Sequence, residues 1–406
     1  MEKNALDQKK AMGVMIVGGI LAFTFFCAVC CGRESLKTAI DCIDAAADFL
    51  RKTKRVIAVP FFFFLLQILA ISIWLPCMAY VTSMNHVAPS ETMPQIKDIT
   101  WDPKVKIMAL YMFFGILWVC AFFEYCSTFV VMVSTSTYYW SSNSMAEGDG
   151  DVALGFSYCF VHFGSLAIGS FIIALIRFIR ITFMYAAQQA EKSSGDNAGV
   201  KAIVRCAECI LACIEKICDY INDSAYAYQA VTGDSFCASA WSAFMLQLRH
   251  MLKFSFAQLI AKIFILLGKV GITAGNMVSC YYIMKLVFKD MDGDLEATPI
   301  DPPITQAYAS VALVGVFSYM VASIFLGLLD TAVLSLLTCV AIDLDRNDGV
   351  LSTEHGPPTF HDGGLDKYDT ADQHAKNREF EDAEGGQREE LGYESFRESW
   401  IFKAMQ

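Results

Sequence analysis

The sequence predicts an all-α, polytopic helical membrane protein with about seven transmembrane helices, followed by an acidic, largely disordered C-terminal tail. Of the 406 residues, 55% are hydrophobic and only 18% are charged, whereas soluble domains are about 25% charged. The mean hydropathy is +0.43. The apolar residues come in long blocks, and a helix of about 20 apolar residues crosses a bilayer core of about 30 Å.

The net charge of −11 is unevenly distributed along the chain. Residues 343–406 contain 16 acidic and 7 basic residues, whereas residues 1–342 contain 26 and 24. We therefore divide the chain into a helical transmembrane domain, residues 1–342, and an acidic cytoplasmic tail, residues 343–406. The acidic balance argues against a nucleic-acid partner, and we expect membrane lipids to surround the first domain.

The apolar blocks predict the spans in order. Residues 11–31 carry no charge and exceed the apolar core of a signal peptide, which indicates a retained helix. Pro60 and Pro76 in the second block are residues that kink helices. The predicted spans are residues 11–31, 56–81, 105–125 with a continuation to 140, part of 158–187, a weaker 202–231, 260–287, and 308–329 with a continuation to 342.

Basic residues predict the orientation. Residues 33–55 contain six cations, and three precede the first span, so the positive-inside rule places residues 33–55 in the cytoplasm. Seven spans then put the N-terminus outside and the tail inside. Within this loop, residues 34–50 carry apolar side chains at helical spacing, which predicts a helix at the cytoplasmic membrane interface. These side chains are Leu36, Ile40, Ile43, Ala47 and Leu50.

Six residues in the predicted spans are candidates for binding a small organic cation. Aromatic faces attract quaternary ammonium groups, and a carboxylate within an apolar helix usually faces the bundle or a water path. The candidates are Trp118, Trp74, Tyr111, Tyr308, Tyr319 and Glu124. The alternatives are that the aromatic residues belong to interfacial belts, and that the third span ends at Glu124, which then reaches the headgroups.

Several motifs, in order and spacing, resemble the choline transporter-like family of eukaryotic membrane proteins. Residues 162–170 resemble the family's H-[LT]-G-S-L-A-F-G-S, residues 213–216 its C-L-E-K, and residues 343–349 its terminal D-L-E-R-N-D-G. Residues 222–237 fit N-x-x-A-Y…G-x-x-F-C. The resemblance covers roughly residues 11–349 and begins near the family's fourth span, so we expect the chain to lack the first three. Lys262 replaces a family aspartate.

The resemblance implies a protein that moves choline or a related small organic cation by gradient-driven alternating access past Trp118. The plasma membrane is the expected location, with an organelle membrane as the alternative. The rival interpretation is a non-transporting accessory subunit of a larger complex, derived from the same fold. A third is an incomplete gene model. We expect no cofactor, metal site or enzymatic activity, because the sequence has no phosphate loop, H-E-x-x-H motif or nucleophile elbow.

The end of the tail carries an apolar cluster within residues 391–402. It consists of Leu391, Phe396, Trp400 and Ile401, which fit one side of a short helix. The cluster predicts a docking element for a protein partner, and the alternative is a flexible tail with a few aromatic residues.

Overall fold

The computed structural model describes residues 33–89, 97–100, 102–194, 198–249, 251–291, 304–347 and 355–362. These residues confirm the predicted all-α fold, apart from one short β-hairpin. The helices are α2 (Arg33–Lys52), the 3-10 turn η1 (Lys54–Ile57), α3 (Ala58–Ser83), α4 (Pro103–Ser141), α5 (Val152–Val161), α6 (Phe163–Ser194), α7 (Ala198–Thr232), α8 (Phe236–Arg249), α9 (Met251–Met291), α10 (Ile304–Arg346) and α11 (Pro358–Asp362). The strands are β1 (His86–Pro89) and β2 (Lys97–Thr100).

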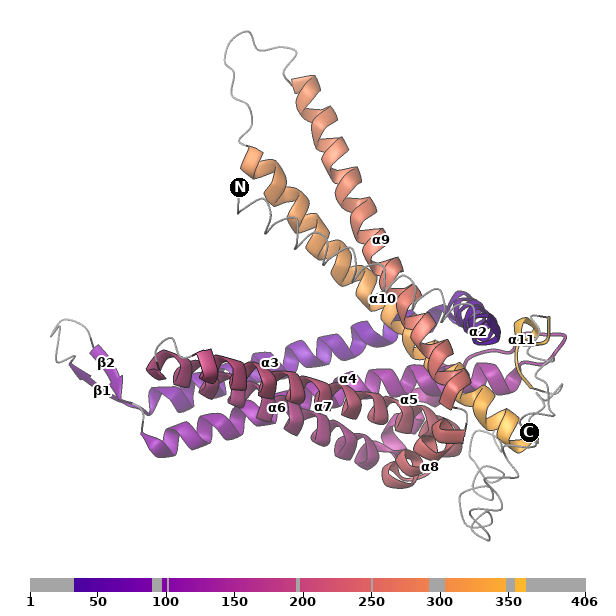
Figure 1. The fold of residues 1–406 in the computed structure, drawn as a ribbon, viewed down its shortest axis with the longest axis horizontal. Helices are drawn as coiled ribbons and strands as arrows, with labels where there is room; N and C mark the ends of the chain where they lie inside the picture. Colours follow the sequence, from indigo (N-terminus) through magenta and orange to yellow (C-terminus); the bar gives the residue numbers. More distant parts are fainter. Residues whose placement is uncertain are drawn as a thin grey trace, which may run out of the picture.

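Four long helices, α3, α4, α6 and α7, run side by side and form a bundle (Figure 1). The β1–β2 hairpin lies at one end of this bundle. Helices α2, α8 and α11 lie at the other end, which we call the α2 end. Helices α9 and α10 pack against each other, cross the bundle near the α2 end and extend away from it. Helix α10 contacts α4, α7 and α2, so the α9–α10 pair is joined to the bundle at this crossing.

Five described helices are long and apolar enough to cross a membrane, which confirms a multi-pass membrane protein. They cover residues 54–83, 103–141, 163–189, 257–286 and 309–346. The predicted first span, residues 11–31, lies outside the described residues. Helix α7 matches the weaker predicted span at 202–231, but it is not among these five. The count of seven spans therefore stays a prediction.

Three local features bear on the sequence prediction. The predicted fourth span, part of residues 158–187, corresponds to α6, which begins at Phe163 after α5 ends at Val161. Pro60 lies in the first turn of α3, where its missing N–H breaks no helical hydrogen bond, and Pro76 lies inside α3. The β-hairpin was not predicted, and its antiparallel register pairs His86 with Thr100.

The second half of α4 forms the centre of the core. Its side chains from Phe129 to Tyr139 are all buried, as expected for a helix enclosed by others. Helix α10 packs along it, and the Ser335 hydroxyl donates to the Met132 carbonyl oxygen at 3.0 Å. The Tyr139 hydroxyl donates to the fully buried Asp343 carboxylate at 3.1 Å. These contacts give the motif at residues 343–349 a structural role.

Helices α6 and α7 approach closely at Gly169. A Cβ atom at Gly169 would lie 2.1 Å from the Tyr226 hydroxyl oxygen and 2.5 Å from Asn222 Oδ1, closer than atoms can pack. The absence of a side chain lets the buried Tyr226 hydroxyl donate to the Leu166 carbonyl oxygen at 3.1 Å. Gly169 is therefore required for this packing.

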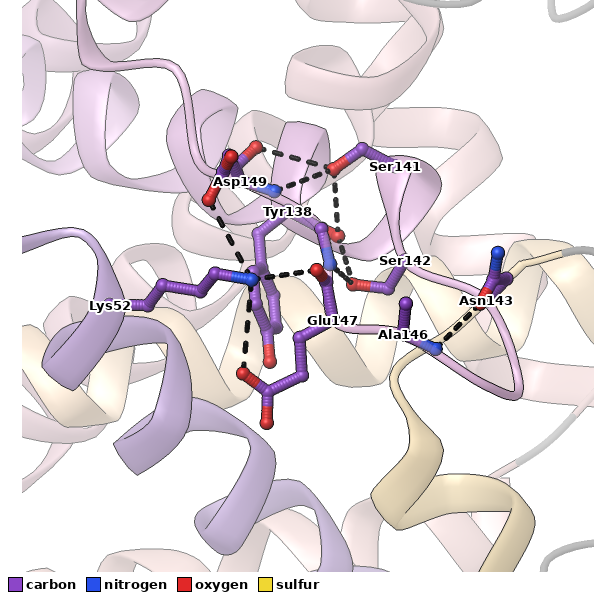
Figure 2. A network of polar contacts seen from close by, with 9 residues as sticks. Lys52, Tyr138, Ser141, Ser142, Asn143, Ala146, Glu147 and Asp149 are labelled. Carbon is purple, nitrogen blue, oxygen red and sulfur yellow. Dashed lines mark hydrogen bonds and ion pairs between the residues drawn. The ribbon is translucent and has the colours of Figure 1, made fainter.

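The loop between α4 and α5 is tied to α2 by a polar network (Figure 2). The Lys52 ammonium group donates to the Glu147 carbonyl oxygen at 2.7 Å and lies 3.7 Å from the Asp149 carboxylate. The buried Ser142 hydroxyl donates to the Tyr138 carbonyl oxygen at 2.6 Å and accepts from the Gly148 N–H. The loop is thereby fixed against the last turns of α2 and α4.

Helix α2 confirms the predicted helix at residues 34–50 and buries a different face from the predicted stripe. Its fully buried side chains include Ala39, Cys42 and Phe49. Ile40, in the predicted stripe, is 52% exposed, and Ala47 is exposed as well. The buried face of α2, which packs against α9 and α10, therefore consists mainly of small residues. The position of α2 at a membrane interface stays a prediction.

Residues 355–362, at the start of the predicted tail, fold back onto the α2 end. The Gly356 N–H donates to the Tyr139 carbonyl oxygen at 3.2 Å, and the positive φ of 93° at this position suits glycine. Phe360 is fully buried beside Tyr139. This part of the tail packs on the membrane domain because an aromatic anchor fills a core position, and the prediction of a largely disordered tail did not single it out. Residues 363–406, including the predicted docking element at 391–402, lie outside the described residues.

Candidate functional site

A polar cavity of about 230 Å³ lies where α9 and α10 cross the bundle. Helices α4, α6, α7, α9 and α10 all contribute to its wall. The lining residues are Glu124, Tyr125, Thr128, Met132, Arg177, Asp219, Asp223, Gln258, Lys262, Asp330, Thr331 and Leu334. Four of them are carboxylates and two are cations, so the wall favours a positively charged occupant.

Arg177 holds one side of the cavity together. Its guanidinium lies 3.1 Å from Glu124, 3.6 Å from Asp219 and 3.6 Å from Glu215, so it joins α6 to α4 and α7. Glu215 also accepts a hydrogen bond from Arg180, one turn further along α6. A planar guanidinium with five donors suits this arrangement of several carboxylates. These pairs neutralise most of the charge on this side.

The other side of the cavity carries Asp223 and Asp330. Among the described residues, neither carboxylate has an ion-pair partner within 4.0 Å. Lys262 interacts electrostatically with both of them, as Lys269 does with Asp330. This side therefore keeps two carboxylates that can stabilise a cation.

Among the predicted binding residues whose side chains the structure describes, only Glu124 lines the cavity. It pairs with Arg177 at 3.1 Å, and its role, in the site or at the headgroups, stays a prediction. Trp118 Nε1 donates to the Ala167 carbonyl oxygen at 3.2 Å, and its ring packs edge-on against Phe171. Trp74 Nε1 donates to the Met112 carbonyl oxygen at 3.0 Å. Both indoles join neighbouring helices.

Two of the three predicted tyrosines lie apart from the cavity lining. Tyr111 on α4 is 75% exposed, and Tyr319 on α10 is 47% exposed. The backbone of Tyr308 belongs to α10, and its side chain lies outside the described residues. The aromatic candidates whose side chains are described therefore do not line the cavity.

Three residues of the cavity wall were not predicted from the sequence, namely Arg177, Asp219 and Asp223. A signal for them exists in the sequence, because Glu215, Asp219 and Asp223 recur every four residues and so share one face of α7. Arg177 is a charged residue within an apolar segment, which marks a functional position in membrane proteins. A search for charged residues within the helical segments, rather than for aromatic residues, would have found these three residues.

The fold and this cavity define a multi-pass helical membrane protein with a charged internal site. The family model for the plasma-membrane choline transporter matches residues 16–345. The chain therefore belongs to this family of choline transporter-like membrane proteins.

Individual relatives agree with this assignment. Choline transporter-like protein 2 of Dictyostelium discoideum is 27% identical over 86% of this chain and 52% of its own length. Human choline transporter-like protein 3 is 25% identical over 84% of this chain and 50% of its own length. Choline transporter-like 2 of Drosophila melanogaster is 29% identical over 61% of this chain. The chain thus spans about half the length of the first and second of these relatives.

Proposed function

We propose that the protein moves choline or a related small organic cation across a membrane, and that the cation binds in the acidic cavity. The observation that carries this proposal is the pair Asp223 and Asp330, two carboxylates with no close ion-pair partner among the described residues, in a cavity of about 230 Å³. The names of the relatives, which are choline transporter-like proteins, supply the chemical class of the solute. The plasma membrane is the proposed location.

The arrangement of the helices supports gradient-driven alternating access. Helices α9 and α10 contribute Lys262 and Asp330 to one side of the cavity, and the bundle contributes the other side. The α9–α10 pair leaves the bundle beyond the crossing (Figure 1). A rocking motion of this pair against the bundle would therefore change access to the cavity while its residues stay on rigid helices.

Uptake of radiolabelled choline into proteoliposomes tests the proposal. We expect saturable uptake by the unmodified protein and at least a tenfold loss with Asp330→Asn, because one unit of charge at a part-buried site changes binding by about this factor or more. Asp44→Asn, which removes an exposed carboxylate on α2, is the matched control and should keep full uptake.

Trp118→Ala tests whether the solute binds at the aromatic candidates rather than in the acidic cavity. Loss of uptake with Trp118→Ala but not with Asp330→Asn would move the binding site to the aromatic candidates. Absence of saturable uptake in every variant, together with a stable complex with another membrane protein, would favour the alternative of a non-transporting accessory subunit. That alternative is favoured by Lys262, a cation already present in the cavity wall.

A further inference from the structure

Lys262 lines the cavity and lies near the same kinds of group that bind an organic ammonium ion. Its ammonium nitrogen lies 5.6 Å from the centroid of the Tyr220 ring on α7, within the range of a cation–π interaction. It lines the same cavity as Asp223 and Asp330, whose negative charges attract it. One aromatic face and two carboxylates therefore lie near a positive charge that belongs to the protein itself.

The ammonium group of Lys262 is weakly held. Lys262 is exposed, and among the described residues it forms no ion pair within 4.0 Å. A lysine has a flexible four-carbon stem and a compact charge, so the head can move away without disturbing the backbone. Arg177 differs, because three carboxylates lie within 3.6 Å of its guanidinium.

From this contrast we propose that Lys262 is an internal competitor, whose ammonium group occupies the place in the cavity that the cationic head of the solute takes. This inference rests on the proposed function and identifies the residue that sets affinity. An organic cation binds by displacing Lys262 from Tyr220, Asp223 and Asp330. In the empty protein, Lys262 compensates for the two carboxylates and keeps the charge of the cavity low.

The positions of the carboxylates argue against the converse role, in which Lys262 would bind an anionic group of the solute. An anion next to Lys262 would also meet Asp223 and Asp330, which interact with the same ammonium group. Like charges within one cavity repel. The cavity therefore selects a cation without an acidic group, such as choline, over a zwitterion, such as glycine betaine.

Equilibrium binding of radiolabelled choline to the purified full-length protein in lipid nanodiscs tests the proposal. We expect Lys262→Gln to lower the dissociation constant about tenfold, because it removes a competing like charge. Lys262→Arg should leave it near the unmodified value, since the charge is kept. Lys269→Gln is the matched control, because Lys269 also lies on α9 and interacts with Asp330 but does not line the cavity.

The outcomes separate this inference from the proposed function. An unchanged or weaker affinity in Lys262→Gln, with binding still abolished by Asp330→Asn, overturns only the role of Lys262. Binding of glycine betaine that is lost in Lys262→Gln overturns it as well. Absence of choline binding in both the unmodified protein and Lys262→Gln overturns both proposals. If Lys262→Gln does not fold, Lys262→Met keeps the length of the stem and takes its place.

Discussion

At the scale of single residues, charge inside the helices needs the most explanation. A charged side chain at the centre of a membrane helix costs about 2.5–3.5 kcal/mol on insertion scales. Arg177 offsets this cost through contacts with Glu124, Asp219 and Glu215. Substituting any one of these three carboxylates leaves the other two in place. The guanidinium of Arg177 therefore keeps two partners in each single-residue variant.

Gly169 gives a stability prediction at the same scale. Gly169→Ala should destabilise the protein by about 1–3 kcal/mol, the usual cost of overpacking, because the new methyl group would overlap the Tyr226 hydroxyl. Thermal unfolding in detergent, followed by tryptophan fluorescence, measures this as a lower midpoint. Gly164→Ala is the control, because no atom lies within 4 Å of its added Cβ. A normal midpoint for Gly169→Ala would contradict the close approach of α6 and α7.

Glu124 shows which part of the candidate site can be predicted from the sequence. A carboxylate in an apolar segment is visible in the sequence, and the structure places Glu124 in the cavity. Trp118 is equally visible, but its indole N–H bonds the Ala167 carbonyl oxygen outside the cavity lining. Periodicity shows the face of a helix on which a side chain lies. It does not show which helix covers that face, so the meeting of Asp223 with Asp330 requires the tertiary structure.

At the scale of elements, α11 is a short helix held by one anchor. A helix of five residues has too few hydrogen bonds to be stable alone, so α11 depends on burial of Phe360 beside Tyr139. Sequence patterns do not reveal such a segment, because its surroundings are acidic and glycine-rich, and its order comes from a distant surface.

Phe360→Ala tests this dependence. Truncating a buried phenylalanine costs about 3–5 kcal/mol, which exceeds what the Gly356 hydrogen bond can supply. We therefore expect residues 355–362 to detach and to be cleaved faster in limited proteolysis. Thr359→Val should stay protected, because the buried Thr359 hydroxyl has no hydrogen-bond partner among the described residues. Equal cleavage of both variants would show that α11 does not depend on this anchor.

At the scale of the whole molecule, composition was enough to predict the fold class. Long apolar segments with few charges have few stable arrangements other than membrane helices. The crossing of α9 and α10 over the bundle (Figure 1) was not predicted, because it depends on contacts such as those of Ser335 with α4. Those contacts join residues about 200 positions apart, beyond the reach of any local pattern.

The fold also predicts the accessibility of two segments. An epitope inserted between β1 and β2 lies at the end of the bundle opposite α2 and α11. With the basic residues 33–55 inside, antibody should reach this epitope on intact cells, and should reach an epitope after Gln406 only once the cells are permeabilised. The reverse pattern would overturn the orientation and keep the fold, whereas labelling of both from one side would contradict the fold.

The docking of residues 355–362 also limits the distance between the end of the tail and the membrane domain. With Phe360 fixed at the α2 end, 28 residues, 363–390, lie between the end of α11 and Leu391. Fully extended, they span at most about 100 Å. Any protein bound at residues 391–402 is therefore tethered within that radius of the membrane domain. The length of the tether, rather than the concentration of that protein in the cell, then sets its effective concentration at the membrane domain.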